Sequence, residues 1–197
     1  MKVNGIDSQI LKFQGTIWHP LSKPDWEQIL YDLWEQNGRP MAIREFDDTI
    51  RSLRFRAAHP RDFVHNAETL GLSIITISKS GDISTFSPEL SGGAQCDSRA
   101  FIVANIAEIG SLDDLLDNKK LRGLAHEVNE GTLLCAQHCD YFDLCGGGSP
   151  SNKYFEHESF RVNETAFCRL QKKVVVDVVL EKLLRQRSRK QMSTTAE

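Results

Sequence analysis

The chain lacks any long apolar run. Its 197 residues contain no stretch of about 18 consecutive apolar side chains, which is the length that a membrane-spanning helix needs. The first 13 residues interleave polar and apolar side chains and so lack the continuous apolar segment of a secretory signal. We therefore expect a cytoplasmic protein with no membrane partner.

The chain also lacks a strong charge of one sign. It has 24 Lys and Arg against 27 Asp and Glu, which gives a formal net charge of -3. Such a balance exerts no overall attraction on nucleic acid. Acidic residues interrupt the Arg-rich stretch from Arg44 to Arg61, and the basic end from Lys182 to Lys190 is typical of a solvated helix end. We expect no nucleic-acid partner.

Cysteine is scarce, and its distribution is uneven. The chain has 5 cysteines, none of them before Cys96. In a reducing cytoplasm disulfides are rare, so clustered cysteines indicate metal or redox chemistry. No Ser, Cys or His falls in a recognisable nucleophile motif, and we assign no catalytic residue. At 40% hydrophobic residues, the chain is large enough for one core with an appendage.

The N-terminal third predicts a helix followed by a strand. Ser22 to Gly38 has the pattern of an amphipathic helix with Pro24 in its first turn. Met41 to Phe46 predicts a short strand, and Arg51 to Arg61 is helical at first and irregular by Pro60. The inner face of the first helix is predicted to carry Trp26, Ile29, Leu30, Leu33 and Trp34.

The middle of the chain predicts a β-hairpin and then helices. Leu72 to Ser78 and Ile83 to Ser87 are β-branched and apolar runs on either side of a Ser-Gly-Asp turn. Phe101 to Ile106 predicts a further extended piece. Two helical stretches follow, at Ser111 to Leu116, with a capping-box pattern, and at Lys119 to Val128.

The last third combines an irregular region with a closing helix. From Gly131 to Cys168 the sequence loses clean periodicity and gains Gly, Asn, Ser and Pro, which predicts a loop shaped around a ligand. Leu170 to Arg187 predicts a helix before the polar tail Ser188 to Glu197. The inner side of that helix is predicted to carry Val174, Val175, Val178 and Leu183.

Four cysteines in the last third form one candidate ligand set. Intervals of three, five and twenty-two residues separate Cys135, Cys139, Cys145 and Cys168. Four thiolates suit an iron-sulfur cluster or a zinc ion, and the glycines Gly146 to Gly148 favour the bulkier cluster because they permit close backbone approach. Zinc remains the alternative metal, and four unconnected buried thiols remain the alternative to any site.

One segment resembles a known family. The run CAQHCDYFDLCGGGSPSNKYFEHESFRVNETAFC is similar to the C-terminal auxiliary-cluster (SPASM) region of radical SAM peptide-modifying enzymes. Within that group it most resembles the cyclophane-forming maturases of the GrrM/OscB type. The pieces MAIREF, Met41 to Phe46, and STFSPEL, Ser84 to Leu90, also fit, so the resemblance extends from about Trp26.

The resemblance implies one auxiliary [4Fe-4S] cluster, held by the four cysteines. It also implies positions for the ligands of a second cluster, but these fall near Phe86 and on Ser149, neither of which is cysteine. Cys96 lies too late after the hairpin to replace them and is interpreted as a free thiol.

The resemblance further implies an α+β fold and a domain plan. A SPASM-like hairpin with helices and a cysteine-rich loop would occupy residues 71–187, after the end of a partial (β/α) barrel at 1–70 and before a disordered tail at 188–197. The chain lacks the Cys-x3-Cys-x2-Cys motif of the radical SAM core. It therefore cannot cleave S-adenosylmethionine by the family's route, and that cofactor is expected only if a missing or separate core chain supplies it.

The function implied is the auxiliary-cluster portion of a peptide maturase. Its partner would be a ribosomally made precursor peptide of the glycine-rich-repeat type. The alternative is a stand-alone iron-sulfur or zinc module that recognises a peptide or protein without catalysis.

Overall fold

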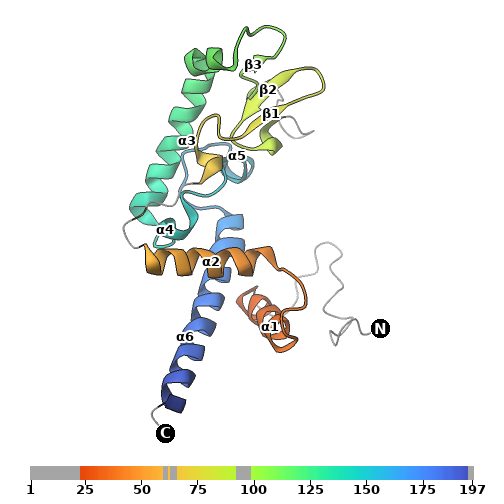
Figure 1. The fold of residues 1–197 in the computed structure, drawn as a ribbon. Coiled ribbons are helices and arrows are strands. Elements are labelled where there is room, and N and C mark those ends of the chain that lie inside the picture. Colours follow the sequence, from red (N-terminus) through yellow and green to blue (C-terminus); the bar gives the residue numbers. More distant parts are fainter. Residues whose placement is uncertain (1–22, 60–61, 63–65, 92–98, 195–197) are drawn as a thin grey trace. The chain divides into compact units, whose positions relative to one another are not determined.

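The protein, seen in a computed structural model, is described over residues 23–59, 62, 66–91 and 99–194 (Figure 1). Within these residues helices combine with one small antiparallel sheet, so the predicted α+β class is confirmed. None of these helices combines the length and the apolar character needed to cross a lipid bilayer. The expected end of a barrel begins in residues 1–22, which lie outside the described part.

The described elements fall into two compact units. One contains the residues up to Phe55 together with those from Leu170 onward, and the other is Arg56 to Arg169. The helices and strands are α1 (Lys23–Gln36), α2 (Arg44–Ala58), β1 (Ile75–Ile77), β2 (Asp82–Thr85), β3 (Ala104–Asn105), α3 (Lys119–His138), α4 (Phe142–Cys145), α5 (Pro150–His157) and α6 (Val174–Thr194).

The first unit packs α1, α2 and α6 around an aromatic cluster. Tyr31 is fully buried, and its ring meets those of Trp34 and Phe46 edge-on at centroid distances of 5.6 and 5.1 Å. The predicted first helix is confirmed, and Trp34 is buried as expected. Trp26 is only half-buried, because the face of α1 that packs in the core is centred on Tyr31 and not on its predicted neighbour Leu30.

The strand predicted at Met41 to Phe46 is wrong, because α2 begins within it at Arg44. Phe46 and Ile50 are one helical turn apart and both are buried, which is the spacing of a helix face. Glu45 and Asp47 in the first turn also suit the positive end of the helix dipole. Six residues were too few to distinguish the two periods.

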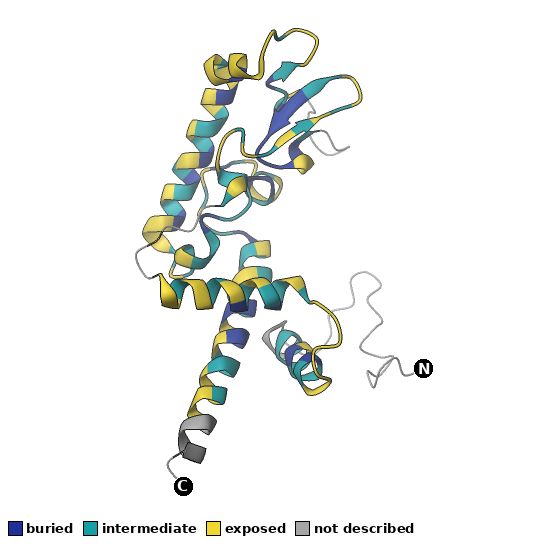
Figure 2. Cartoon of the chain, in the orientation of Figure 1, coloured by how far each residue is buried: buried dark blue, intermediate teal, exposed yellow. Residues whose placement is uncertain are grey.

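The closing helix belongs to the first unit. It follows a π-helical turn at Cys168–Lys173 and continues as α6 to Thr194, beyond the end expected at Arg187. Among its side chains up to Ser188, the buried ones, which include the predicted Val175 and Val178, lie in the first half of the helix (Figure 2). These valines complete the aromatic cluster, and the described elements divide into compact units at 55/56 and 169/170. The expected domain plan of 1–70, 71–187 and 188–197 stays a prediction.

The second unit contains the predicted hairpin. Strand β1 pairs antiparallel with β2, with Ile75 opposite Thr85, and Gly81 takes a left-handed φ of 85° in the turn. The extended piece expected at Phe101 to Ile106 supplies the short strand β3, which pairs with β2. The capping box at Ser111 and Asp114 is also present, at the start of a 3-10 helix, Leu112–Asp117.

The cysteine region is more helical than predicted. Helix α3 runs to His138 instead of Val128, and α4 and α5 occupy much of the expected loop. After Val128 the buried face of α3 continues through Gly131 and Cys135. The sequence hides this continuation, because a glycine and a cysteine stand where an amphipathic pattern would show large apolar residues.

At Gly131, helix α3 lies close against the backbone of another segment. A Cβ atom at this position would lie 1.9 Å from the backbone oxygen of Phe160, which is far inside contact distance. Phe160 is buried and packs edge-on against Phe101 in the core of the unit. The absence of a side chain on α3 therefore lets the segment after Phe160 run directly against the helix.

We predict opposite effects for two glycine substitutions in α3. Gly131→Ala should destabilise the protein by about 2 kcal/mol or more, because helix and segment must separate. Gly123→Ala, with open space around its Cβ, should instead stabilise it by roughly 0.5–1 kcal/mol through helix propensity. Urea unfolding followed by circular dichroism measures both, and equal effects of the two changes would contradict this packing.

Candidate functional site

The four candidate ligands all lie in the second unit, each at the end of a helical element. Cys135 is in the last turn of α3, and Cys139 follows as its C-cap, donating its backbone N–H to the Cys135 carbonyl at 2.9 Å. Cys145 is the last residue of α4, and Cys168 is the first residue of the π-helical turn. No disulfide joins any two of these four cysteines.

Cys135 is the buried member of the set, with 6% of its surface exposed. Its single S–H can donate to the carbonyl oxygen of Asn163, at 3.4 Å, or to that of Gly147, at 3.6 Å. The Nζ of Lys153 in turn donates to the Cys135 sulfur at 3.4 Å. Helix α5 and two loop segments of the unit therefore contact this one sulfur.

The pKa of the Cys135 thiol shows which charges lie near it. Burial raises this pKa most, and the Lys153 ammonium opposes the rise. Negative charge on Cys145 and Cys139 raises the pKa further, since a like charge disfavours ionisation. The pKa of the Cys135 thiol therefore depends on its burial first, and then on the charges of Lys153, Cys145 and Cys139.

The glycine run directly after Cys145 shapes the wall of the site. Gly146, Gly147 and Gly148 have φ angles of 67°, 111° and 72°, all in the left-handed region that favours glycine. Gly146 ends α4, and its N–H donates to the Phe142 carbonyl at 2.8 Å. A Cβ at Gly147 would lie 2.9 Å from the Thr132 methyl carbon, so this backbone approaches α3 closely.

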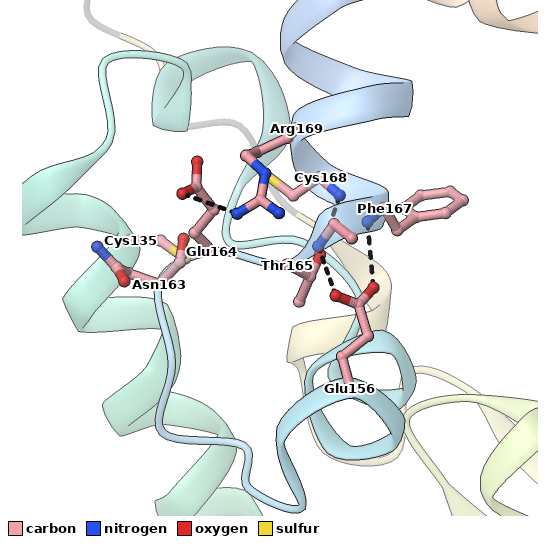
Figure 3. A network of polar contacts seen from close by, with 9 residues as sticks. Cys135, Glu156, Asn163, Glu164, Thr165, Phe167, Cys168 and Arg169 are labelled. Carbon is pink, nitrogen blue, oxygen red and sulfur yellow. Dashed lines mark hydrogen bonds and ion pairs between the residues drawn. The ribbon is translucent and has the colours of Figure 1, made fainter. Parts of the chain in front are cut away.

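Two side chains set the position of Cys168 (Figure 3). The hydroxyl of Thr165, a buried residue, accepts the Cys168 N–H at 2.9 Å. The carboxylate of Glu156, from α5, accepts the backbone N–H groups of Ala166 and, at 3.1 Å, of Phe167. These bonds satisfy the free donors at the start of the π-helical turn, as capping residues do.

The positions expected for a second cluster hold other chemistry. Phe86 is a buried core residue. Ser149 shares a hydrogen bond of 2.8 Å with the hydroxyl of Ser151, which in turn accepts one of 3.2 Å from Ser87 at the end of the hairpin. Cys96 lies outside the described residues.

Sequence reasoning missed Lys153, Thr165 and Glu156. A signal was present for Thr165, which stands three residues before Cys168 in the spacing of a helix N-cap. The sequence holds no such signal for Lys153 or Glu156, because a helical pattern does not distinguish a charged side chain that contacts another segment from one that faces solvent. Only the packing of α5 directs both side chains toward the cysteine-bearing segments.

The donor set fits a soft metal ion or an iron-sulfur cluster in its chemistry. It consists of four thiols, and a buried ammonium donates to the sulfur of one of them, Cys135. The side chains do not stand as a closed ligand shell, since no three or more His, Cys, Asp or Glu among the described residues are arranged to hold a metal ion. Ligation would therefore require the sulfurs to draw together.

Comparisons with known proteins identify one relative. The chain is 37% identical over 108 residues to the uncharacterized protein sll1766 of Synechocystis sp. (strain ATCC 27184 / PCC 6803 / Kazusa). This match covers 55% of the chain and 27% of the relative, so the chain spans only part of the length of that protein. No protein-family model matches the chain, and no solved structure does so either.

We predict that the four thiols differ in reactivity in the metal-free protein. Cys135 should be alkylated at least ~10-fold more slowly than Cys168 near neutral pH, because it is buried and its raised pKa lowers the thiolate population. Pulsed iodoacetamide labelling with peptide mass spectrometry measures each site. After unfolding in guanidinium the difference should vanish, and equal rates in the folded protein would contradict the burial of Cys135.

Proposed function

We propose that this chain binds one [4Fe-4S] cluster through Cys135, Cys139, Cys145 and Cys168 and serves as the auxiliary-cluster portion of a radical SAM peptide maturase. The observation that carries the proposal is the convergence of the cysteine-bearing backbone on the buried Cys135. Cys139 caps the same helix end, Gly147, two residues after Cys145, lies 3.6 Å from the Cys135 sulfur, and the buried Lys153 ammonium donates to that sulfur at 3.4 Å. The resemblance of the cysteine segment to SPASM regions supplies the reaction class.

The wall of the site favours a cluster over a single ion. Two of the three consecutive left-handed glycines are buried, and they bring bare backbone beside Cys145 and Cys135. An iron-sulfur cluster is bulkier than zinc and benefits from backbone that approaches closely. A zinc site would use the same four thiolates, so metal analysis has to separate the two.

Other residues of the chain would shield the Cys135 ligand from solvent and fix the backbone at Cys168. The carbonyl of Asn163 or of Gly147 accepts from the Cys135 thiol in the metal-free protein, and ligation would release the sulfur from both. Thr165 and Glu156 hold the backbone that carries Cys168. When bound, the cluster would supply electron transfer or a placement surface for the substrate peptide. We propose a ribosomally made, glycine-rich precursor peptide as that substrate and the cytoplasm as the location.

Cleavage of S-adenosylmethionine would fall to another stretch of protein. The chain has no Cys-x3-Cys-x2-Cys motif, and the relative that it matches is about twice as long as this chain. A radical SAM core, covalently joined or separate, is therefore part of the proposal. Coding DNA beside this gene should contain a frame with that motif, and its absence would favour the stand-alone module.

We predict that each ligand is required for the cluster. After anaerobic purification the chain should contain about four iron and four sulfide per molecule with broad visible absorption. Replacement of any one of Cys135, Cys139, Cys145 or Cys168 by serine should remove most of both.

The matched control is Cys96→Ser, which removes a thiol outside the proposed set and should leave iron and absorption unchanged. Full iron in Cys145→Ser or Cys168→Ser would overturn the ligand assignment. One zinc per chain without iron would replace the cluster by the zinc module.

A further inference from the structure

Lys153 is a buried cation with an unusual set of partners. It lies in α5 with only 5% of its surface exposed. Its Nζ donates to the Gly131 carbonyl at 2.9 Å and to the Cys135 sulfur at 3.4 Å. No ion pair formed by the described residues includes this ammonium.

A buried ammonium without a counter-charge is costly. Removing such a group from water costs several kcal/mol unless it is paired with an anion. A carbonyl oxygen and a protonated thiol are weak compensation, whereas a thiolate accepts a charge-assisted hydrogen bond. The Lys153 ammonium is therefore best compensated when the Cys135 sulfur carries negative charge, as a metal-bound thiolate does. In that state the sulfur has no proton to donate to the carbonyls of Asn163 and Gly147, so Lys153 is the donor that faces it.

The fold makes room for this ammonium. The second acceptor, the Gly131 carbonyl, belongs to the same face of α3 as Cys135 and holds the Nζ beside the sulfur. A Cβ at Gly131 would lie 3.2 Å from the Nζ, within the tight range of contacts. The missing side chain of Gly131 thus leaves room for both the Phe160 backbone and the Lys153 ammonium.

We infer that Lys153 sets the reduction potential of the cluster by donating an N–H···S hydrogen bond to its Cys135 ligand. The inference rests on the proposed function. Net charge and hydrogen bonds to sulfur are the levers by which proteins tune such clusters. The reduced cluster carries one more negative charge than the oxidised one, so a nearby cation in a dry environment favours reduction and raises the potential. Lys153 is a positioning residue and not a ligand.

Three substitutions separate charge from packing. Lys153→Met keeps the length of the side chain but removes its charge and its donors. Lys153→Gln is neutral but retains donors for the Gly131 carbonyl, and Lys153→Arg retains the charge. The matched control is Lys79→Met, which removes the same charge from an exposed position in the hairpin turn.

The experiment is an anaerobic redox titration of the loaded protein, followed by visible absorption and electron paramagnetic resonance. Lys153→Met and Lys153→Gln should lower the midpoint potential by the equivalent of at least a tenfold change in the reduced-to-oxidised ratio, about 59 mV for one electron. Lys153→Arg should stay nearer to the unmodified protein, and Lys79→Met should match it.

The outcomes keep the two proposals distinct. Loaded Lys153→Met or Lys153→Gln protein with an unchanged potential would overturn the role of Lys153 and leave the cluster assignment intact. If Lys153→Met does not load, the potential of Lys153→Gln decides. An unmodified chain that binds no iron-sulfur cluster would overturn the proposed function itself.

Discussion

The contact of α3 with the segment that starts at Phe160 depends on one missing side chain. With no Cβ at Gly131, the Phe160 carbonyl rests against the helix, and the segment continues past Cys135 so that the Asn163 carbonyl reaches its sulfur. The same gap admits the Lys153 ammonium. The close approach of these two backbones therefore accounts for three features of the site. It buries the Cys135 sulfur, it brings the Asn163 carbonyl to that sulfur, and it leaves room for the Lys153 ammonium.

The remaining ligands depend on how helices end. Cys139 caps α3, Cys145 closes α4, and Cys168 opens a π-helical turn, so each thiol stands where backbone groups have lost their helical partners. Side chains then satisfy those groups, as Thr165 and Glu156 do near Cys168. Among the described residues no three or more His, Cys, Asp or Glu side chains are arranged to hold a metal ion, so ligation would require these helix ends to shift.

Local patterns predicted the elements whose signals are short in range. The hairpin, the capping box at Ser111 and the first helix are present, because turn glycines, caps and a 3.6-residue period act within a few residues. The same reasoning failed at Met41 to Phe46, which lies partly in α2, and at the cysteine region, where Gly131 interrupted the pattern of a continuing helix. In both cases the local sequence is compatible with two structures, strand or helix in the first and loop or helix in the second, and tertiary contacts select the helix.

The sequence by itself determined that four cysteines, closely spaced and followed by three glycines, stand in a polar stretch of an α+β chain. It also determined the hairpin, since the turn and its flanking β-branched residues suffice to specify one. Only the tertiary structure decided that Cys135 is buried, that Lys153 faces it, and that the valines of α6 complete the core of the first unit. Burial and charge pairing are relations between segments distant in sequence, and no local pattern encodes them.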